Sequence, residues 1–226
     1  MPLLPSQSTR GTDCSLDLPP DPGSPRVNND KGRRVANKKT PEQAVAEGYG
    51  PIARALHWAV FLLVVVVGWL GLLHDDWPRA TQATWINRHA ILGLIMLLLV
   101  VWRLVYRRLH TPPDLPPDVG EFSRRVSHPV HMLIYALLVV IPVLGIITFI
   151  WHGRVFDFGF TQVDFHVTRD KAVFHPTEDW HGYLSYGLFG LAGLHALAAL
   201  WHHFVRKDGV LRRMIPGLPW VGKGRG

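Results

Sequence analysis

The chain has 226 residues, a hydrophobic fraction of 48% and a formal net charge of +7 at pH 7. This length fits one ordinary domain with a tail, and the near-average composition alone decides neither for nor against a membrane protein. A single cysteine, Cys14, excludes an internal disulfide framework, a cysteine-rich zinc finger and covalent haem attachment through a CxxCH motif. The 13 histidines are many for this length, so ligand chemistry is worth looking for.

Residues 1–50 are rich in Pro, Ser, Asp, Asn and Lys and contain almost no apolar run. Such a composition cannot bury enough apolar surface to offset the entropy lost on ordering, so we predict a disordered tail. The segment also lacks the apolar stretch of about 7–15 residues that a secretory signal needs. A mis-assigned start codon is the other explanation for it.

Four long apolar segments follow, at about residues 55–73, 90–106, 129–151 and 182–205. A helix that spans the hydrocarbon core needs about 20 residues, and each segment is close to that length. Tryptophans gather near the segment ends, as in the aromatic belts at membrane interfaces; they are Trp58, Trp77, Trp85, Trp102, Trp151, Trp180 and Trp201. We therefore predict an all-α integral membrane four-helix bundle over residues 51–216, with a short C-terminal tail over 217–226.

Lysine and arginine residues predict the orientation of this bundle. The connection over 103–128 contains five of them, and the chain after the fourth segment contains six. The connections over 74–88 and 152–180 contain Arg79, Arg88, Arg154, Arg169 and Lys171 and, with their acidic residues, sum to a charge of about −2. The positive-inside rule then places both termini in the cytoplasm, and the basic character of the chain requires no nucleic-acid partner.

The last apolar segment contains two histidines, His181 and His195, fourteen residues apart. Fourteen helical residues turn through about 1400°, close to four full turns, and rise about 21 Å. Both side chains therefore project from one face, near opposite leaflets. A zinc site needs ligands packed around one ion, so this separation indicates two separate centres, one on each side of the membrane.

Each centre needs a second ligand, and the depth of a histidine along its helix indicates which one it is. His57 begins the first span at its cytoplasmic edge, and His89 begins the second at the opposite edge, since that span runs the other way. Depth matching pairs His89 with His181 on the periplasmic side and His57 with His195 toward the cytoplasm. Two bis-histidine sites predict two non-covalent b-type haems, whose six-coordinate iron suits electron transfer rather than oxygen binding.

Two histidine assignments stay open at this stage. His202 lies seven residues beyond His195 on the same face, and estimated depth favours His195 as the partner of His57. His131 is interpreted as a haem-side residue, a quinone contact or an interfacial cap, of which the cap is the simplest. The remaining histidines of the outer connections are interpreted as solvated; they are His74, His152, His166 and His175.

Glycines and one arginine share the faces of the predicted ligands. Gly71, Gly93 and Gly145 either leave room for a flat macrocycle or serve ordinary helix packing. Arg103 lies near the depth of the predicted cytoplasmic haem. It either pairs with a haem propionate there or anchors its helix at the cytoplasmic interface.

Four segments resemble the prokaryotic cytochrome b561 family: RALHWAVFLLVV, INRHAILGLIMLLLVVWRLVYR, SHPVHMLIYALLVVIPVLGIITF and WHGYLSYGLFGLAGLHALAALWHHFVRKDGVLRRMIP. The resemblance covers about residues 48–216, and its closing HH…KD…LRRMIP stretch is especially specific. It implies a four-helix dihaem protein of the bacterial inner membrane that exchanges electrons with the quinone pool. One kind of member oxidises periplasmic superoxide and reduces ubiquinone. The long N-terminal tail departs from the family pattern.

The resemblance also assigns the family's haem ligands to His57, His89, His181 and His195. We expect an electron to pass between the haem of His89 and His181 and the haem of His57 and His195, and then to a quinone, or in reverse. The first alternative is a cytochrome b subunit that docks on a hydrogenase or dehydrogenase partner. The second is a non-redox haem carrier or sensor, against which bis-histidine ligation argues because transport needs exchangeable ligands.

The 152–180 connection alternates aromatic and polar residues, with Phe156, Phe158 and Phe160 in series. This pattern favours a position at the membrane interface, either as a lipid anchor or around the mouth of a quinone or substrate site. The chain contains no recognisable nucleotide-binding loop, catalytic triad or nucleic-acid motif.

Overall fold

The structure is a computed structural model that describes residues 48–110 and 119–218. Its helices are α2 (Pro51–Leu72), α3 (Arg79–Leu109), α4 (Glu121–Trp151) and α5 (Lys171–Trp201), followed by a π-helical turn η1 (His202–Arg206) and a 3-10 turn η2 (Leu211–Arg213). Two short strands, β1 (Phe156–Asp157) and β2 (Gln162–Val163), lie between α4 and α5. The predicted N-terminal tail lies outside the described residues, apart from its last three positions.

Four helices of the described chain are long and apolar enough to span a membrane, as predicted. Their limits differ from the apolar segments, because α3, α4 and α5 each begin 8 to 11 residues earlier. A helix of 31 residues is about 46 Å long, whereas the hydrocarbon core is about 30 Å thick. Apolar sequence marks the part of a helix in lipid, while its backbone hydrogen bonds continue through the polar ends.

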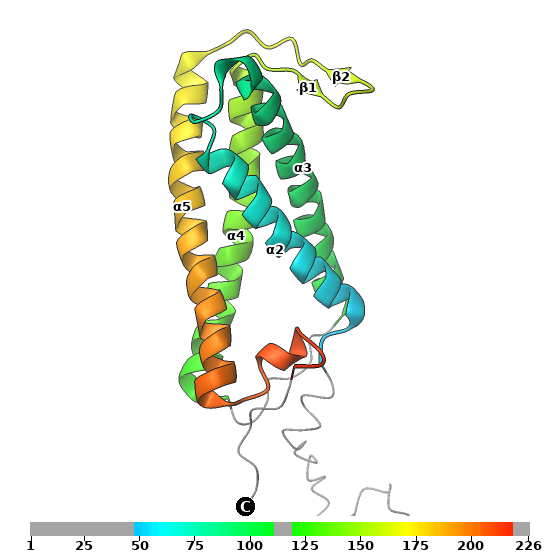
Figure 1. The fold of residues 1–226 in the computed structure, drawn as a ribbon, viewed down its shortest axis with the longest axis vertical. Coiled ribbons are helices and arrows are strands. Elements are labelled where there is room, and N and C mark those ends of the chain that lie inside the picture. Colours follow the sequence, from blue (N-terminus) through cyan, green and yellow to red (C-terminus); the bar gives the residue numbers. More distant parts are fainter. Residues whose placement is uncertain (1–47, 111–118, 219–226) are drawn as a thin grey trace, which may run out of the picture. The chain divides into compact units, whose positions relative to one another are not determined.

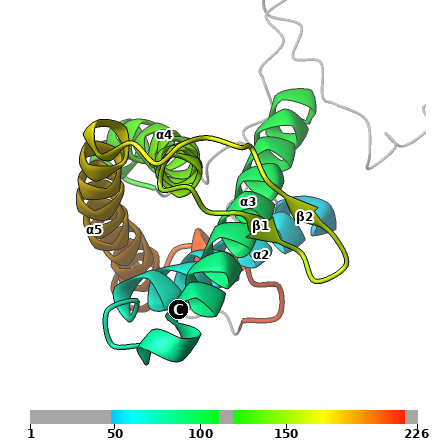
Figure 2. The same cartoon turned by 90° about the horizontal axis from the view of Figure 1, so that it is seen from above.

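Helix α2 packs along α3, α4 packs along α5, and α3 joins the two pairs through α4 (Figures 1 and 2). A core cluster of buried residues takes side chains from all four helices; it consists of Val60, Met96, Val100, Leu138, Ile141 and Leu188. Many other large apolar residues of the helices are exposed, as expected for helices whose outer faces contact lipid. The described residues thus form an all-α membrane four-helix bundle.

At one end of the bundle, β1 and β2 form an antiparallel hairpin in which Phe156 pairs with Val163. Asn87 of α3 fastens this hairpin, because its amide donates to the carbonyl of Asp157 at 2.7 Å and accepts from the Asp157 N–H at 3.1 Å. In Figure 2 the chain crosses from α4 over α3 before it returns to α5. We call this the hairpin end.

At the other end, residues 202–218 form a hook that returns to the start of α2 (Figure 1). Lys207 reverses the chain with a left-handed φ of 54°. The indole of Trp58 donates to the carbonyl of Met214 at 3.2 Å, and the guanidinium of Arg213 lies 5.3 Å from the centre of the Tyr49 ring. The buried carboxylate of Asp208 forms a hydrogen bond of 2.5 Å with His202 Nδ1. We call this the hook end.

Candidate functional site

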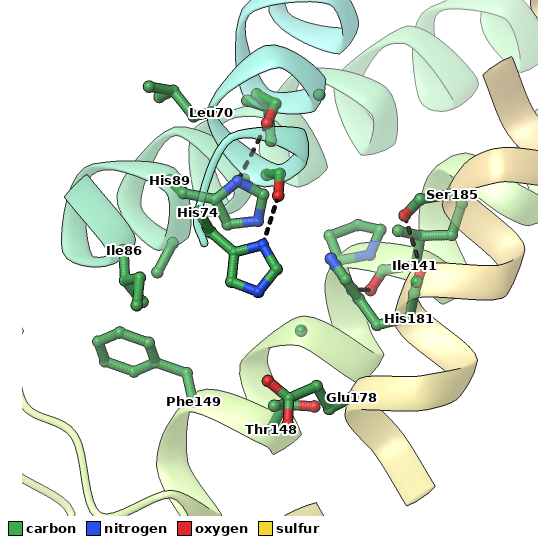
Figure 3. Close-up of a pocket in the computed structure, with 18 of the residues that line it drawn as sticks. Leu70, His74, Ile86, His89, Ile141, Thr148, Phe149, Glu178, His181 and Ser185 are labelled. Carbon is green, nitrogen blue, oxygen red and sulfur yellow. Dashed lines mark hydrogen bonds between the residues drawn. The ribbon is translucent and has the colours of Figure 1, made fainter. Parts of the chain in front are cut away.

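A cavity of about 270 Å³ opens between the two helix pairs at the hairpin end (Figure 3). Residues of α2, α3, α4 and α5 line it, and most of them are apolar. His89 of α3 and His181 of α5 face each other across this cavity. Their ring centres are 5.9 Å apart, and the ring planes are 77° apart. The structure therefore brings together the first pair of histidines that depth matching predicted.

Backbone carbonyls orient both of these rings. His89 Nδ1 lies 3.0 Å from the carbonyl oxygen of Val67, and His181 Nδ1 lies 2.9 Å from that of Ile141. A carbonyl can only accept, so each Nδ1 carries the proton and donates it. The Nε2 atom of each ring is then unprotonated and available to a metal, in the arrangement typical of metal-binding histidines.

Two glycines give these rings their space. A Cβ atom on Gly71 would lie 3.0 Å from His89 Cε1, and one on Gly145 would lie 2.9 Å from His181 Cε1. Any larger residue would have to push the ring away. Gly71 and Gly145 therefore make room for the imidazoles themselves. Gly93 lines the cavity with open space beside it, as a residue that leaves room for a ligand would.

A second cluster lies toward the hook end and takes one side chain from each helix: His57, Arg103, His131 and His195. Arg103 donates to the Tyr135 hydroxyl at 2.9 Å, to the Ala53 carbonyl at 2.9 Å and to His57 Nδ1 at 3.2 Å. The His131 and His195 rings are 5.1 Å apart between centres. His195 and His131 both lie close enough to His57 to interact with it electrostatically.

The His57 ring differs from the hairpin-end rings in its partner. Arginine can only donate, so Nδ1 of His57 accepts from Arg103 and the proton lies on Nε2. For Nε2 to bind a metal, the proton must move to Nδ1, so Arg103 must first give up its hydrogen bond to Nδ1. Of the two histidines that the sequence left as partners of His57, His195 lies in this cluster beside His131, whereas His202 is bonded to Asp208 in the hook.

The model of the family described as prokaryotic cytochrome b561 matches residues 48–217, which include all four helices and nearly all of the hook. The chain belongs to the prokaryotic cytochrome b561 family.

Three relatives agree with this membership. The chain is 29% identical over 170 residues to a protein named "Probable superoxide oxidase CybB" from Yersinia pestis, which covers 74% of this chain and 96% of the relative. It is 27% identical to "Cytochrome b561 homolog 2" of Escherichia coli (strain K12), over 75% of this chain and 92% of the relative. It is 26% identical to "Cytochrome b561 homolog 1" of the same organism, over 71% and 93%.

Membership in the cytochrome b561 family implies a multi-pass membrane protein that binds b-type haem and transfers electrons. The hairpin-end pair fits such a group. Metal–imidazole bonds are about 2 Å long, so two rings on opposite sides of one metal have centres roughly 6 Å apart. The observed 5.9 Å agrees with this value, and the cavity between the rings is mostly apolar. Among the described residues, no three His, Cys, Asp or Glu side chains gather as an ordinary metal site would require.

Sequence reasoning left His131 open, and its simplest interpretation, an interfacial cap, is incomplete. Its Nδ1 does lie within hydrogen-bond distance of the Ser127 carbonyl, but its ring contacts His195. The sequence contains the spacing that matches these two histidines, but only the structure shows the contact that sets their level. Gly145 packs on His181, and His131 and His195 each lie fourteen residues from these two along antiparallel helices, so the two histidines are level.

His74 is exposed, as predicted for a solvated loop residue, whereas His152 is partly buried. His74 and His152 both line the hairpin-end cavity. The His152 ring lies 4.6 Å from the Phe174 ring between centres, and its Nε2 accepts from the Arg169 guanidinium at 3.2 Å. Burial, followed by the charges of Arg154 and Arg169, lowers the pKa of His152, so this ring is neutral at pH 7. His166 and His175 are exposed, as predicted.

Proposed function

We propose that this protein carries electrons across the membrane by means of two b-type haems. His89 and His181 hold one at the hairpin end, and His57 and His195 hold the other toward the hook end. Facing imidazoles, each with Nδ1 fixed on a backbone carbonyl, are the observation that carries the proposal. Bound haem iron supplies a one-electron couple, and its axial ligands and surroundings set the potential.

The chain's own residues prepare the hairpin-end site for this role. The carbonyls of Val67 and Ile141 fix the ring orientation, so the side chains lose little conformational entropy when a metal binds. At the hook-end site, release of His57 by Arg103 frees a guanidinium for a haem propionate, which a guanidinium binds well. His181 and His195 are about 21 Å apart along α5, so the two centres lie at different depths.

We further propose that both termini are cytoplasmic and that the hairpin end faces the periplasm of a bacterial inner membrane. The positive-inside rule supports this orientation, because the hook-end segments carry most of the basic residues. Electrons then pass between a periplasmic donor or acceptor and a quinone such as ubiquinone, in either direction. Superoxide is a candidate donor, since one relative is named as a probable superoxide oxidase.

The purified protein tests the haem proposal directly. A reduced-minus-oxidised spectrum is expected to show low-spin b-type bands, with two haems per chain by pyridine haemochrome assay. His89→Ala and His181→Ala should each remove the same haem, and His57→Ala and His195→Ala the other. His175→Ala is the matched control, because this ring is exposed. One haem per wild-type chain, or loss of both haems from each variant, would contradict the pairing.

The electron partners need a separate experiment. Under anaerobic conditions, ubiquinol or a pulse of superoxide is added to the oxidised protein, and haem reduction is followed by absorbance. Rapid reduction by superoxide supports a superoxide oxidase. Reduction by ubiquinol alone favours a quinol-linked carrier or a subunit docked on a hydrogenase or dehydrogenase. Reduction by neither argues for the non-redox alternative.

A further inference from the structure

Arg154 is the one permanently charged cation that lines the hairpin-end cavity within the described part of the chain. It follows the end of α4 by three residues, and its side chain is half-buried. The cavity lining is otherwise mostly apolar, with His89 and His181 facing each other and Glu178 as its acidic residue (Figure 3). A single guanidinium in such a lining is a candidate ligand-binding group.

The Arg154 guanidinium forms no hydrogen bond or ion pair with any residue that the structure describes. Glu178 and Arg169 lie near enough to act on it electrostatically, but neither is bonded to it. The guanidinium of Arg169 is engaged elsewhere, because it donates to His152 and lies 4.9 Å from the centre of the Phe174 ring. Burying a charged group without a partner is costly, so the position of Arg154 favours an anion in the cavity.

We propose that Arg154 binds a carboxylate inside the hairpin-end cavity, and that this carboxylate is a propionate of the haem held by His89 and His181. A guanidinium and a carboxylate form two parallel, charge-assisted hydrogen bonds, which makes this pairing strong and directional. A small free carboxylate that enters from solvent offers the same chemistry from another source. The inference rests on the proposed haem site.

The test uses the full-length, haem-loaded protein in lipid nanodiscs. Arg154→Gln removes the charge and Arg154→Lys keeps it. Arg79→Gln is the matched control, because Arg79 is exposed at the start of α3 and does not line the cavity. The midpoint potential of each haem is measured by spectroelectrochemistry. A nearby cation favours the reduced state of a haem. Arg154→Gln should therefore lower the midpoint potential of one haem by about 59 mV, which corresponds to a tenfold change in the equilibrium constant for its reduction.

Isotope labelling separates the two sources of the carboxylate. Protein is produced with haem labelled with carbon-13 at the propionate carboxyls, and redox-difference infrared spectra are recorded. A shift of the labelled bands in Arg154→Gln, but not in Arg79→Gln, supports the propionate. Unchanged labelled bands, together with an acetate-dependent potential in wild type that Arg154→Gln loses, would assign a free carboxylate and overturn the propionate source.

Equal potentials and equal labelled bands in Arg154→Gln and Arg79→Gln overturn the proposal altogether. Should Arg154→Gln fail to retain haem, retention by Arg154→Lys supports a role for the charge, and loss from both variants counts against it. Failure of the proposed function is distinguishable, because it appears in the wild-type protein as a missing second haem before any Arg154 variant is measured.

Discussion

The two glycines beside the facing histidines act at the level of single atoms. Gly71 and Gly145 allow two helices in each pair to approach until an imidazole lies against the neighbouring backbone. The same approach lets each ring donate to a carbonyl one turn earlier, at Val67 or Ile141. The position and the tautomer of each ring are thus set by the backbone of the neighbouring helix.

Replacing Gly145 or Gly71 with alanine should therefore weaken the hairpin-end haem. The new Cβ atom must displace His181 or His89, so the variant should retain less haem per chain than the wild-type protein, measured by pyridine haemochrome assay. Gly190→Ala is the matched control, since this exposed residue does not line the cavity and its Cβ would meet open space. Alanine also favours a helix over glycine by roughly 1 kcal/mol, so Gly190→Ala should not lower stability. Equal haem content in all three variants would contradict this explanation.

Sequence reasoning reached His89, His181, His57 and His195 because depth along a helix follows from residue number. It left His131 undecided, because the relative rotation and height of α4 and α5 depend on packing. It also treated His152 as solvated, because a residue beyond an apolar segment has no evident partner until the fold closes. The structure shows His152 beside Phe174 and Arg169, whereas His74 is exposed as predicted.

At the scale of elements, the apolar segments predicted how many helices there are but not how far they extend. His89 and His181 were expected at the ends of spans, yet each is the eleventh residue of a 31-residue helix. Polar residues 79–88 and 171–180 carry little hydropathy signal, so only hydrogen bonding shows that they are helical. Both histidines are therefore held from two sides by continuous helix rather than at fraying ends.

The β1–β2 hairpin should lie in the lipid headgroup region. Asn87, which fastens it, lies three residues before the apolar run of α3, or about 4.5 Å. The headgroup region on each side is about 5–7 Å thick. Phe160 and Phe165 remain 89% and 52% exposed, which favours contact with lipid.

Spin labels test this placement. Cys14→Ser provides a background without cysteine, and a nitroxide is attached at Phe160→Cys. Collision with oxygen and with a water-soluble nickel reagent should place the label at interfacial depth, between labels at Leu98→Cys in lipid and Asp75→Cys in water. A label at position 160 that is as water-accessible as the one at position 75 would show that the hairpin stands clear of the membrane.

At the scale of the whole molecule, the two ends of the bundle differ in charge, and this difference predicts the orientation. In the Cys14→Ser background, a membrane-impermeant maleimide should label Asp75→Cys in intact cells and Pro216→Cys only after permeabilisation. Both positions are exposed, so access depends on the side of the membrane. Labelling in the reverse order would place the termini in the periplasm.

The pairing of a carbonyl, a glycine and a histidine occurs twice. Val67, Gly71 and His89 share the α2–α3 pair, and Ile141, Gly145 and His181 share α4–α5. Four residues separate carbonyl from glycine in both pairs, so the two pairs present their histidines through the same local geometry. In that correspondence His57 matches His131 and Arg103 matches His195. Each of the four lies fourteen residues along its own helix from the glycine or histidine of the hairpin-end site. The hairpin-end site thus takes equivalent residues from both helix pairs, whereas at the hook end Arg103 stands in one pair where His195 stands in the other.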